Sequence, residues 1–230
     1  MFENFGHQIF KNIIEHDWWK LYLKGAGVTI VMALIAVLIG ICLGSLVAII
    51  KVKVRKNRLL RPLEFLCDVY ITIVRGTPVV LQVLVCFLIV FAAAPVKYNI
   101  LIAGLAFGIN SGAYVSEIIR AGILAVDIGQ TEAGRSLGLT DNQTMSRIVF
   151  PQAIKNILPA LGNEFIVLVK ETAVAGYMAV EDLTKVAVLI QSRTYSAMVP
   201  LLTSALLYLC MVLLMTWGLR KFERRLARNE

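Results

Sequence analysis

The sequence predicts an all-α integral membrane protein with five transmembrane helices, its N-terminus outside the cell and its C-terminus inside. Of the 230 residues, 58% are hydrophobic, and five apolar runs are too long for a soluble core. Residues 30–50 hold no charged side chain, and a run of this length suits a bilayer core roughly 30 Å thick. Basic residues follow the first and the last run, as they do at cytoplasmic membrane ends.

The five predicted spans cover residues 30–50, 78–96, 98–112, 157–169 and 199–219. The third run extends toward residue 119 and the fourth toward residue 180. The fourth is the least apolar, because Glu164, Lys170 and Glu171 interrupt it. We expect residues 1–230 to form a single transmembrane domain.

The placement of the positive charge sets the orientation. The net charge is +8, and two basic clusters carry much of it: Lys51, Lys53, Arg55, Lys56, Arg58 and Arg61, then Arg220, Lys221, Arg224, Arg225 and Arg228. An odd number of crossings puts both clusters on one side, the cytoplasmic one. Phosphate-binding clusters would not need to respect that topology, so we expect no nucleic-acid partner.

The N-terminal segment, residues 1–24, is not a secretory signal, because acids and lysines interrupt it before any apolar core. Phe2, Phe5, Ile9 and Ile13 recur at helical spacing, and the pair Trp18–Trp19 follows. This pattern predicts a helix that lies along the extracellular face of the membrane, with the two tryptophans as an aromatic anchor. A disordered tail is the alternative.

The cysteines and histidines do not have the spacing of a metal site or a disulfide framework. The four cysteines form no Cys-x-x-Cys pair, and the only histidines are His7 and His16. We therefore expect the cysteines to pack as small apolar side chains.

Glycines four residues apart mark two of the spans. Gly40 and Gly44 share one face of the first span, and Gly104, Gly108 and Gly112 repeat the spacing in the third. Small residues at this interval let helix backbones approach closely in lipid. The alternative is chance, since glycine is common in membrane helices.

The second span carries the sequence "VRGTPVVLQ". Gly76 and Pro78 interrupt the helix, and Thr77, which precedes a proline, is driven away from helical backbone angles. Such a break at membrane depth is tolerated where it lines a cavity, and its freed donors would face an anionic group. Gln82 lies one turn further on. The competing interpretation is an ordinary proline kink with Arg75 snorkelling to the interface.

Polar side chains inside the third and fourth spans are candidate functional groups, because ionisable residues are costly in a membrane. We expect Glu117 and Arg120, three residues apart, to form an ion pair within one helix. Glu164 has no cation three or four residues away, so it either faces a water-filled path or pairs with Arg75. The other polar residues here are Asn110, Ser111, Ser116, Asn163, Lys170, Glu171 and Thr172.

A polar loop, residues 125–156, separates the third and fourth spans on the cytoplasmic side. We predict a short helix over residues 131–137, with Gly138 in the left-handed position that ends it. Thr140 and Gln143 form a predicted capping box for a second helix, which should end before Pro151. Two rigid helices joined at a glycine would suit docking to another protein.

This loop resembles the EAA loop of the permease subunits of ABC importers. Glu132, Ala133 and Gly138 match the family pattern, and Ile148, Val149, Phe150 and Pro151 follow at the family's interval. Gly134 replaces the second alanine and Phe150 replaces leucine. Glycine should loosen the helix by up to about 1 kcal/mol relative to alanine. The resemblance assigns ATPase coupling to Glu132, Ala133, Gly134, Arg135, Leu137, Gly138 and Leu139.

Residues 20–226 resemble the permeases for polar amino acids, including those for arginine, histidine and glutamine. The motifs are "RGTPVVLQ", "INSGAYVSEIIRAGI", "VDIGQTEAGRSLGLT", "PQAIKNILPALGNEF" and "LVKETAV". The resemblance implies a type I ABC importer-like fold in a bacterial plasma membrane, and as partners a cytoplasmic ATPase, an extracytoplasmic amino acid-binding protein and a second permease. It also implies a substrate site, which we expect to contain Thr77, Gln82, Asn163 and Glu164.

The chain has no Gly-x-x-x-x-Gly-Lys-[Ser/Thr] phosphate loop. We therefore expect it to hold no cofactor, with ATP bound by the partner, and not to be an enzyme. A secondary transporter driven by an ion gradient is the alternative function, with Glu117 and Glu164 as ion sites. Five spans are few for the internal repeats of such transporters, and the docking loop would have no purpose there.

Overall fold

The computed structural model describes residues 5–54 and 60–227, and these residues form helices and no strand. The α-helices are α1 (Phe5–Ile9), α2 (Trp18–Val54), α3 (Arg61–Gly76), α4 (Val79–Val85), α5 (Asn99–Leu124), α6 (Ile128–Ser136), α7 (Asp141–Thr144), α8 (Phe150–Glu171), α9 (Leu183–Thr194) and α10 (Met198–Ala227). Three π-helical segments, Phe10–Ile14, Cys86–Val90 and Met145–Val149, and three 3-10 segments, Glu15–Asp17, Val96–Tyr98 and Thr172–Met178, connect them.

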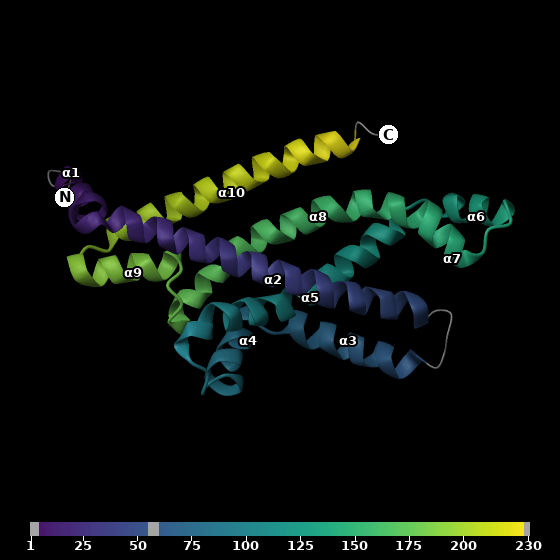
Figure 1. Cartoon of the computed structure of the whole chain (residues 1–230), viewed down its shortest axis with the longest axis horizontal. Helices are drawn as coiled ribbons and strands as arrows, with labels where there is room; N and C mark the ends of the chain where they lie inside the picture. Colours follow the sequence, from purple (N-terminus) through teal and green to yellow (C-terminus); the bar gives the residue numbers. More distant parts are fainter. Residues whose placement is uncertain (1–4, 55–59, 228–230) are drawn as a thin grey trace.

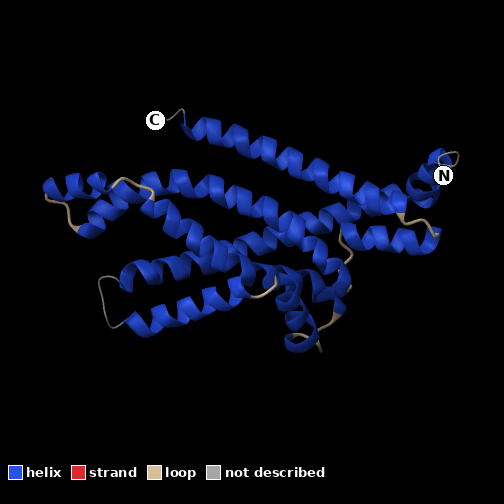
Figure 2. Cartoon of the chain, turned by 180° about the vertical axis from the view of Figure 1, so that it is seen from behind, coloured by secondary structure: helices blue, strands red, loops and turns tan. Residues whose placement is uncertain are grey.

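The molecule is elongated, and its two ends differ in content (Figures 1 and 2). The N-terminal segment and α9 lie at one end. The C-terminal ends of α2 and α10 and the helices α6 and α7 lie at the other. The described members of the two basic clusters, which lie on the last turns of α2 and α10 and at the start of α3, therefore share an end, opposite the N-terminal segment.

Three helical stretches of the described chain are long and apolar enough to cross a membrane: residues Phe10–Val52, Val96–Leu124 and Met198–Leu226. A fourth crossing is formed if the bent pair Arg61–Gly76 and Val79–Val90 counts as one. The predicted fourth span falls on α8, which is not among these stretches because of its polar residues. The five-span count therefore stays a prediction.

The pairing of α2 with α5 shows why their glycines are spaced by four. On α5, Gly104, Gly108 and Gly112 face Ile35, Ile39 and Leu43 of α2, which repeat at the same interval. A Cβ added to Gly108 would lie 2.6 Å from the Cβ of Ile39, closer than real contacts allow. Gly40 and Gly44 of α2 receive Ser111 and Val115 of α5 in the same way. The predicted close packing is confirmed in both spans.

An apolar core holds α4 and α8 against this pair. Its fully buried members include Met32, Val83, Phe107 and Leu168, which come from α2, α4, α5 and α8. The broken span and the predicted fourth span therefore both rest on the α2–α5 pair.

The N-terminal segment differs from the single helix expected over residues 1–24. Helix α2 begins at Trp18, after α1, a π segment and a 3-10 turn in which His16 and Asp17 have positive φ. Trp18 is 5% exposed and packs on Leu183 and Ile190 of α9, whereas Trp19 is 44% exposed. Only Trp19 is thus free to act as the expected anchor, and Phe2 lies outside the described residues.

Candidate functional site

The second span breaks where the sequence predicts. Helix α3 ends at Gly76, Thr77 is extended at φ −122° and ψ 149°, and α4 starts after Pro78. The helical stretches on the two sides differ in direction by 108°. The Thr77 hydroxyl donates to the Ile73 carbonyl at 2.8 Å and so occupies one acceptor that the end of α3 leaves open.

Gln82 bridges the break from the first turns of α4. Its side-chain amide donates to the Val74 carbonyl at 2.7 Å, the Thr77 carbonyl at 3.1 Å and the Thr77 hydroxyl oxygen at 2.8 Å. These bonds satisfy carbonyls that would otherwise lack a donor in the interior. Thr77 and Gln82, both predicted site residues, are thus in direct contact.

Two neighbouring residues of α5 extend this polar group toward α8. Asn110 donates through Nδ2 to Gln82 Oε1 at 2.9 Å, and the Ser111 hydroxyl donates to Glu164 Oε1 at 2.8 Å. Both are almost fully buried, at 3% and 0% exposure. Both residues were expected among the polar groups of the third span, but neither was predicted to belong to the site. The signal available was two consecutive hydrogen-bonding side chains between Gly108 and Gly112.

Glu164 and its neighbour Asn163 have different surroundings. Glu164 is half-buried, whereas Asn163 is exposed and makes no side-chain hydrogen bond within the described residues. The expected alternative, a pair between Glu164 and Arg75, is not formed in the described part of the chain. The Arg75 guanidinium instead lies over the Tyr114 ring, 5.4 Å from its centroid. The structure therefore joins Glu164 to Thr77 and Gln82 through α5, and leaves Asn163 outside that chain of bonds.

A charged cavity of about 620 Å³ lies toward the basic end of the molecule. The predicted ion pair is confirmed there, with Arg120 Nη2 2.6 Å from Glu117 Oε2. Arg75, directly before the break, also lines it, so the cavity reaches from the break toward that end. The lining residues are Lys51, Val52, Glu64, Arg75, Glu117, Arg120, Ile123, Leu124 and Met145.

The loop 125–156 begins with a capped helix. Helix α6 starts at Ile128 rather than at residue 131, because the Asp127 carboxylate accepts from the Gly129 N–H at 2.7 Å. It ends at Ser136, one residue before the predicted end, and Gly138 takes the predicted left-handed position. Gly138 has φ +80°, its N–H donates to Arg135, and the Leu139 N–H donates to Gly134. These two bonds form a Schellman motif.

The second helix of the loop is capped as expected but does not stop at the proline. The Thr140–Gln143 capping box is present at the start of α7. The chain then continues through the π segment Met145–Val149 into α8, with Pro151 in the first turn of α8. The expected end before Pro151 is therefore wrong. A π turn is wider than an α turn, and here it precedes the proline ring, which would clash with the carbonyl four residues earlier in a regular helix.

Contacts between its helices brace the loop. The Arg135 guanidinium lies 3.2 Å from the Asp141 carboxylate, and Gln152 donates to Gln130 at 3.3 Å. Gly134 is buried, and a Cβ there would lie 2.8 Å from Thr144 Cγ2. The glycine thus does more than loosen a helix, because its missing side chain lets α6 lie against α7 and the π segment.

The outer surface of α6 is free for a partner. Of the expected coupling residues, Gly134 is buried and Leu139 partly buried, while Glu132, Ala133, Arg135, Leu137 and Gly138 are exposed. Leu137 is 80% exposed and Ile128 74% exposed. Two exposed aliphatic side chains flanking a carboxylate make a mixed surface of the kind that protein partners cover.

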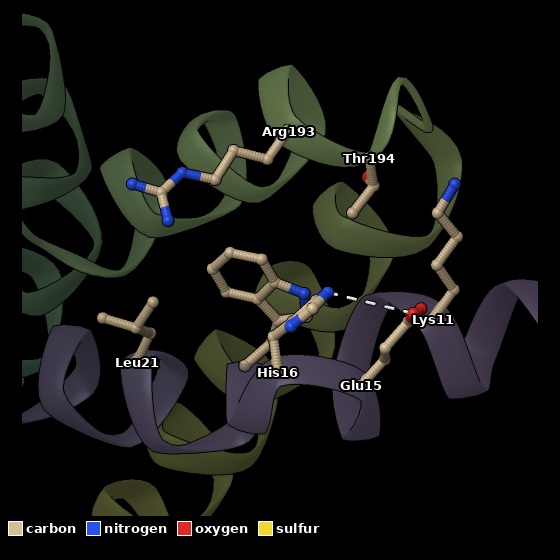
Figure 3. Close-up of a pocket in the computed structure, with 7 residues that line it drawn as sticks. Lys11, Glu15, His16, Leu21, Arg193 and Thr194 are labelled. Atoms are coloured by element: carbon tan, nitrogen blue, oxygen red, sulfur yellow. Dashed lines mark ion pairs between the residues drawn. The ribbon is translucent and has the colours of Figure 1, made fainter.

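A second cavity, of about 480 Å³, lies where the N-terminal segment meets α9 (Figure 3). His16 Nε2 lies 3.8 Å from Glu15 Oε1, and the Arg193 guanidinium lies 5.4 Å from the centroid of the Trp18 ring. Its lining is Lys11, Glu15, His16, Trp18, Leu21, Arg193 and Thr194. It contains no residue of the predicted site. Among the described residues no group of histidine, cysteine and carboxylate side chains suits a metal ion, and the four cysteines are unpaired.

Comparison with known proteins gives one consistent family. Residues 57–228 match the family model described as "Binding-protein-dependent transport system inner membrane component". A relative in Rickettsia bellii, provisionally named glutamine transport system permease protein GlnP, is 40% identical over 95% of this chain and 99% of its own length. The arginine transport system permease protein ArtQ of Bacillus subtilis is 36% identical, over 90% and 93%.

Solved structures agree with the sequence relatives. The crystal structure of an amino acid ABC transporter with histidines contains a chain that is 42% identical, with a TM-score of 0.84, covering 90% of this chain and 95% of that one. A chain of the inward-facing MetNI methionine ABC transporter is 20% identical, with a TM-score of 0.75 over 92% and 98%, and so supports the fold alone.

Proposed function

Because this chain belongs to the family of inner-membrane components of binding-protein-dependent transport systems, we propose that it is the permease of an ABC importer for a polar α-amino acid. The observation that carries the proposal is the braced, exposed loop 125–156 joined without interruption to α8, whose Glu164 meets the polar site. ATP is bound and hydrolysed by a separate subunit, and this chain supplies the path. Relatives named for glutamine and arginine favour a substrate with an amide or basic side chain.

Coupling to the ATPase is assigned to α6 and the turn after it, residues Glu132, Ala133, Gly134, Arg135, Leu137, Gly138 and Leu139. Their exposed members would seat in the ATPase, while buried Gly134 lets α6 lie against α7 and the π segment that leads into α8. A movement of the ATPase would then reach α8 through packed atoms rather than through a flexible linker. Such a connection lets ATP binding shift the permease between outward and inward states.

The substrate site is assigned to Thr77, Gln82, Asn163 and Glu164. A half-buried carboxylate without a cationic partner in the described residues is suited to the amino group or a basic side chain of the substrate. Gln82 has its amide committed to the break and to Asn110 in this conformation. Its role is therefore to hold the shape of the broken helix and to exchange partners when substrate arrives. The cavity beside Arg75 is the inner part of the path.

The proposed topology has five crossings with the N-terminus outside, in a bacterial plasma membrane. The bent pair α3–α4 is the second crossing and α8 the fourth. The polar residues of α8 are compatible with a membrane span because Glu164 faces α5 and not lipid. The extracytoplasmic binding protein would deliver substrate at the end that carries α9. A second permease, either another copy or a related chain, completes the pathway.

The decisive experiment is to extract the tagged chain gently from its own host membrane and to identify what co-purifies. A Walker-motif ATPase in equal amount supports the proposal, and a second permease band decides between homodimer and heterodimer. Glu132→Lys should release the ATPase, whereas Glu181→Lys, a charge reversal at the opposite end, should retain it. If the chain came out alone and still moved amino acid along an ion gradient in vesicles, secondary transport would replace this proposal.

A further inference from the structure

One face of α10 changes character regularly along its last turns. Leu213, Thr216, Trp217, Arg220, Lys221 and Arg224 follow one another at alternating intervals of three residues and one, and line a surface cavity of about 520 Å³ along this one helix. At 1.5 Å per residue, the stripe is roughly 16 Å long. It passes from an aliphatic side chain, through a hydroxyl and an indole, to three cations. The same order of polarity occurs along a phospholipid, from acyl chain through glycerol to phosphate.

One acid, Glu223, lies between these cations in the sequence, but it is not part of the stripe. No carboxylate lines the cavity, and within the described residues Arg220, Lys221 and Arg224 form no ion pair. Lys221 lies over the Trp217 ring, 5.2 Å from its centroid, which keeps the ammonium at the indole. The basic end of α2 differs, because Lys51 Nζ there lies 2.7 Å from Asp68 Oδ1. The positive charge on α10 is therefore available to an external anion.

The cavity faces outward along a helix that is little covered by the rest of the chain. Only 17% of the most apolar window of α10 is buried, and Trp217 is 66% and Leu213 59% exposed. In both views α6 and α7 project further along the long axis than the end of α10 (Figures 1 and 2). The cations thus lie closer to the bilayer than the loop that would dock to an ATPase, which favours a lipid over an acidic protein surface.

We propose that this cavity is a binding site for the headgroup of an anionic phospholipid in the cytoplasmic leaflet. The phosphate lies between Arg220, Lys221 and Arg224, the glycerol region lies at Thr216 and Trp217, and an acyl chain follows Leu213. Arginine and lysine both donate to phosphate oxygens, and each basic residue near an anionic surface contributes about five-fold in affinity. The site depends on the placement of α10 in the membrane and not on the identity of the transported amino acid.

Trp217 provides a direct reporter for this site. The chain has three tryptophans, and the other two, Trp18 and Trp19, lie in the N-terminal segment at the opposite end. The assembled transporter is reconstituted in phosphatidylcholine with a small fraction of brominated phosphatidylglycerol or, in parallel, brominated phosphatidylcholine. Bromine quenches indole fluorescence on contact. Subtracting the signal of a Trp217→Phe transporter removes every other tryptophan, including those of partner subunits.

We expect brominated phosphatidylglycerol to quench Trp217 at least about three-fold more than the brominated phosphatidylcholine. Replacing Arg220, Lys221 and Arg224 together by Gln should remove that excess. Arg225→Gln is the matched control, because Arg225 is an exposed cation at the same end but not part of the stripe, and it should keep most of the excess.

Four results would overturn the site. Equal quenching by the two brominated lipids would show no preference for the anionic headgroup. The same loss in Arg225→Gln as in the triple variant would show general surface charge rather than a cavity. Loss of the ATPase subunit from the triple variant, or displacement of the quenching by inorganic phosphate alone, would assign the cations to an acidic partner surface or to a free anion.

Discussion

The α2–α5 pair and the loop 125–156 both contain a glycine at a close contact between two helices, but the two contacts differ in what surrounds them. In both, a glycine lacks the side chain that would separate two helices: Gly108 against Ile39, and Gly134 against Thr144. The α2–α5 contact lies at the centre of the molecule and carries the core to which α4 and α8 attach. The α6 contact lies at the periphery, and one exposed face remains beyond it.

The difference teaches that the same added methyl group has different consequences in the two places. At the α2–α5 pair there is no route of relaxation that leaves the fold intact, so the cost is stability. In the loop, α6 can swing away from α7 into water, so the cost is the rigidity of the connection between ATPase and α8. The comparison predicts that stability and transport separate according to which glycine is changed.

The largest effect is expected at the centre. Gly108→Val should place side-chain atoms into Ile39 and beside the Ala36 carbonyl, and should destabilise the protein by about 3 kcal/mol or more. The measurement is thermal unfolding of the detergent-solubilised chain. Gly27→Ala is the control on the same helix pair, since nothing lies within 4 Å of its Cβ position. It should be neutral or stabilise by up to about 1 kcal/mol. Similar losses in both variants would remove the steric basis of the comparison.

In the loop, transport and not folding should be lost. Glu132→Lys reverses the charge on the exposed face of α6, and a bulky residue at Gly138 is strained at φ +80°. Either change should reduce uptake at least ten-fold. For Glu132→Lys the reason is that a desolvated charge left unpaired at an interface costs about 2–5 kcal/mol of binding. For Gly138 the reason is that the strained backbone displaces the turn that follows α6. The unfolding temperature should shift little. Normal uptake from a well-expressed Glu132→Lys transporter would contradict the assignment of this surface.

Glu164 tests the contact between α8 and α5, where its carboxylate accepts from Ser111 beside the α2–α5 glycines. Glu164→Gln keeps the acceptor for the Ser111 hydroxyl and removes the charge. We expect folding to be retained and the affinity for a basic substrate to fall about ten-fold, a loss of about 1.4 kcal/mol. Binding by reconstituted transporter checks this with a neutral amino acid as the comparison substrate. Unchanged affinity and selectivity would mean that Glu164 does not meet substrate.

Gly134→Ala sharpens the comparison by restoring the alanine that the EAA pattern has. Its Cβ would meet Thr144 Cγ2, and we expect a loss of about 1 kcal/mol in the coupling of α6 to α8, seen as a several-fold drop in transport per ATP hydrolysed. Adding Thr144→Ser removes that methyl but leaves Ile148 Cδ1 at 2.9 Å, so it should restore transport in part. A double variant no better than the single one would show that packing at Thr144 is not the cause.

The smallest effect is expected at an exposed pair that belongs to neither region. Lys24 Nζ lies 2.8 Å from Glu181, and this cation lowers the pKa of the Glu181 carboxyl below its ordinary value. The stabilisation is therefore complete at neutral pH and is lost as pH falls through the ordinary glutamate pKa to the lowered one. Both side chains are mostly exposed, so Lys24→Gln should cost under about 1 kcal/mol at pH 7 and nothing in strong acid. Unfolding temperatures at the two pH values measure it. A cost as large as that of Gly108→Val would mean that surface charge rivals steric fit.

Several features followed from short stretches of sequence. The break at Gly76–Pro78, the positive φ of Gly138 and the capping box at Thr140 depend on residues within one or two turns, and all were found where predicted. The glycine stripes were equally readable, because a four-residue interval marks one face of a helix. The continuation past Pro151 was missed, since a π turn has no comparable local signature. Helix α9 was not predicted, because its 12 residues are too few to cross a membrane and only membrane-spanning lengths were sought in that region.

The sequence by itself thus determined where helices bend, where they are capped and which faces are small, because these properties arise from neighbours along the chain. Only the tertiary structure decided which polar groups meet. Gln82 bonds to Asn110, 28 residues away, and Ser111 bonds to Glu164, 53 residues away. It likewise decided that Trp18 is buried and that the space beside Gly134 is too small for a side chain. Each of these depends on the angle and depth at which two distant helices pack, which no local pattern encodes.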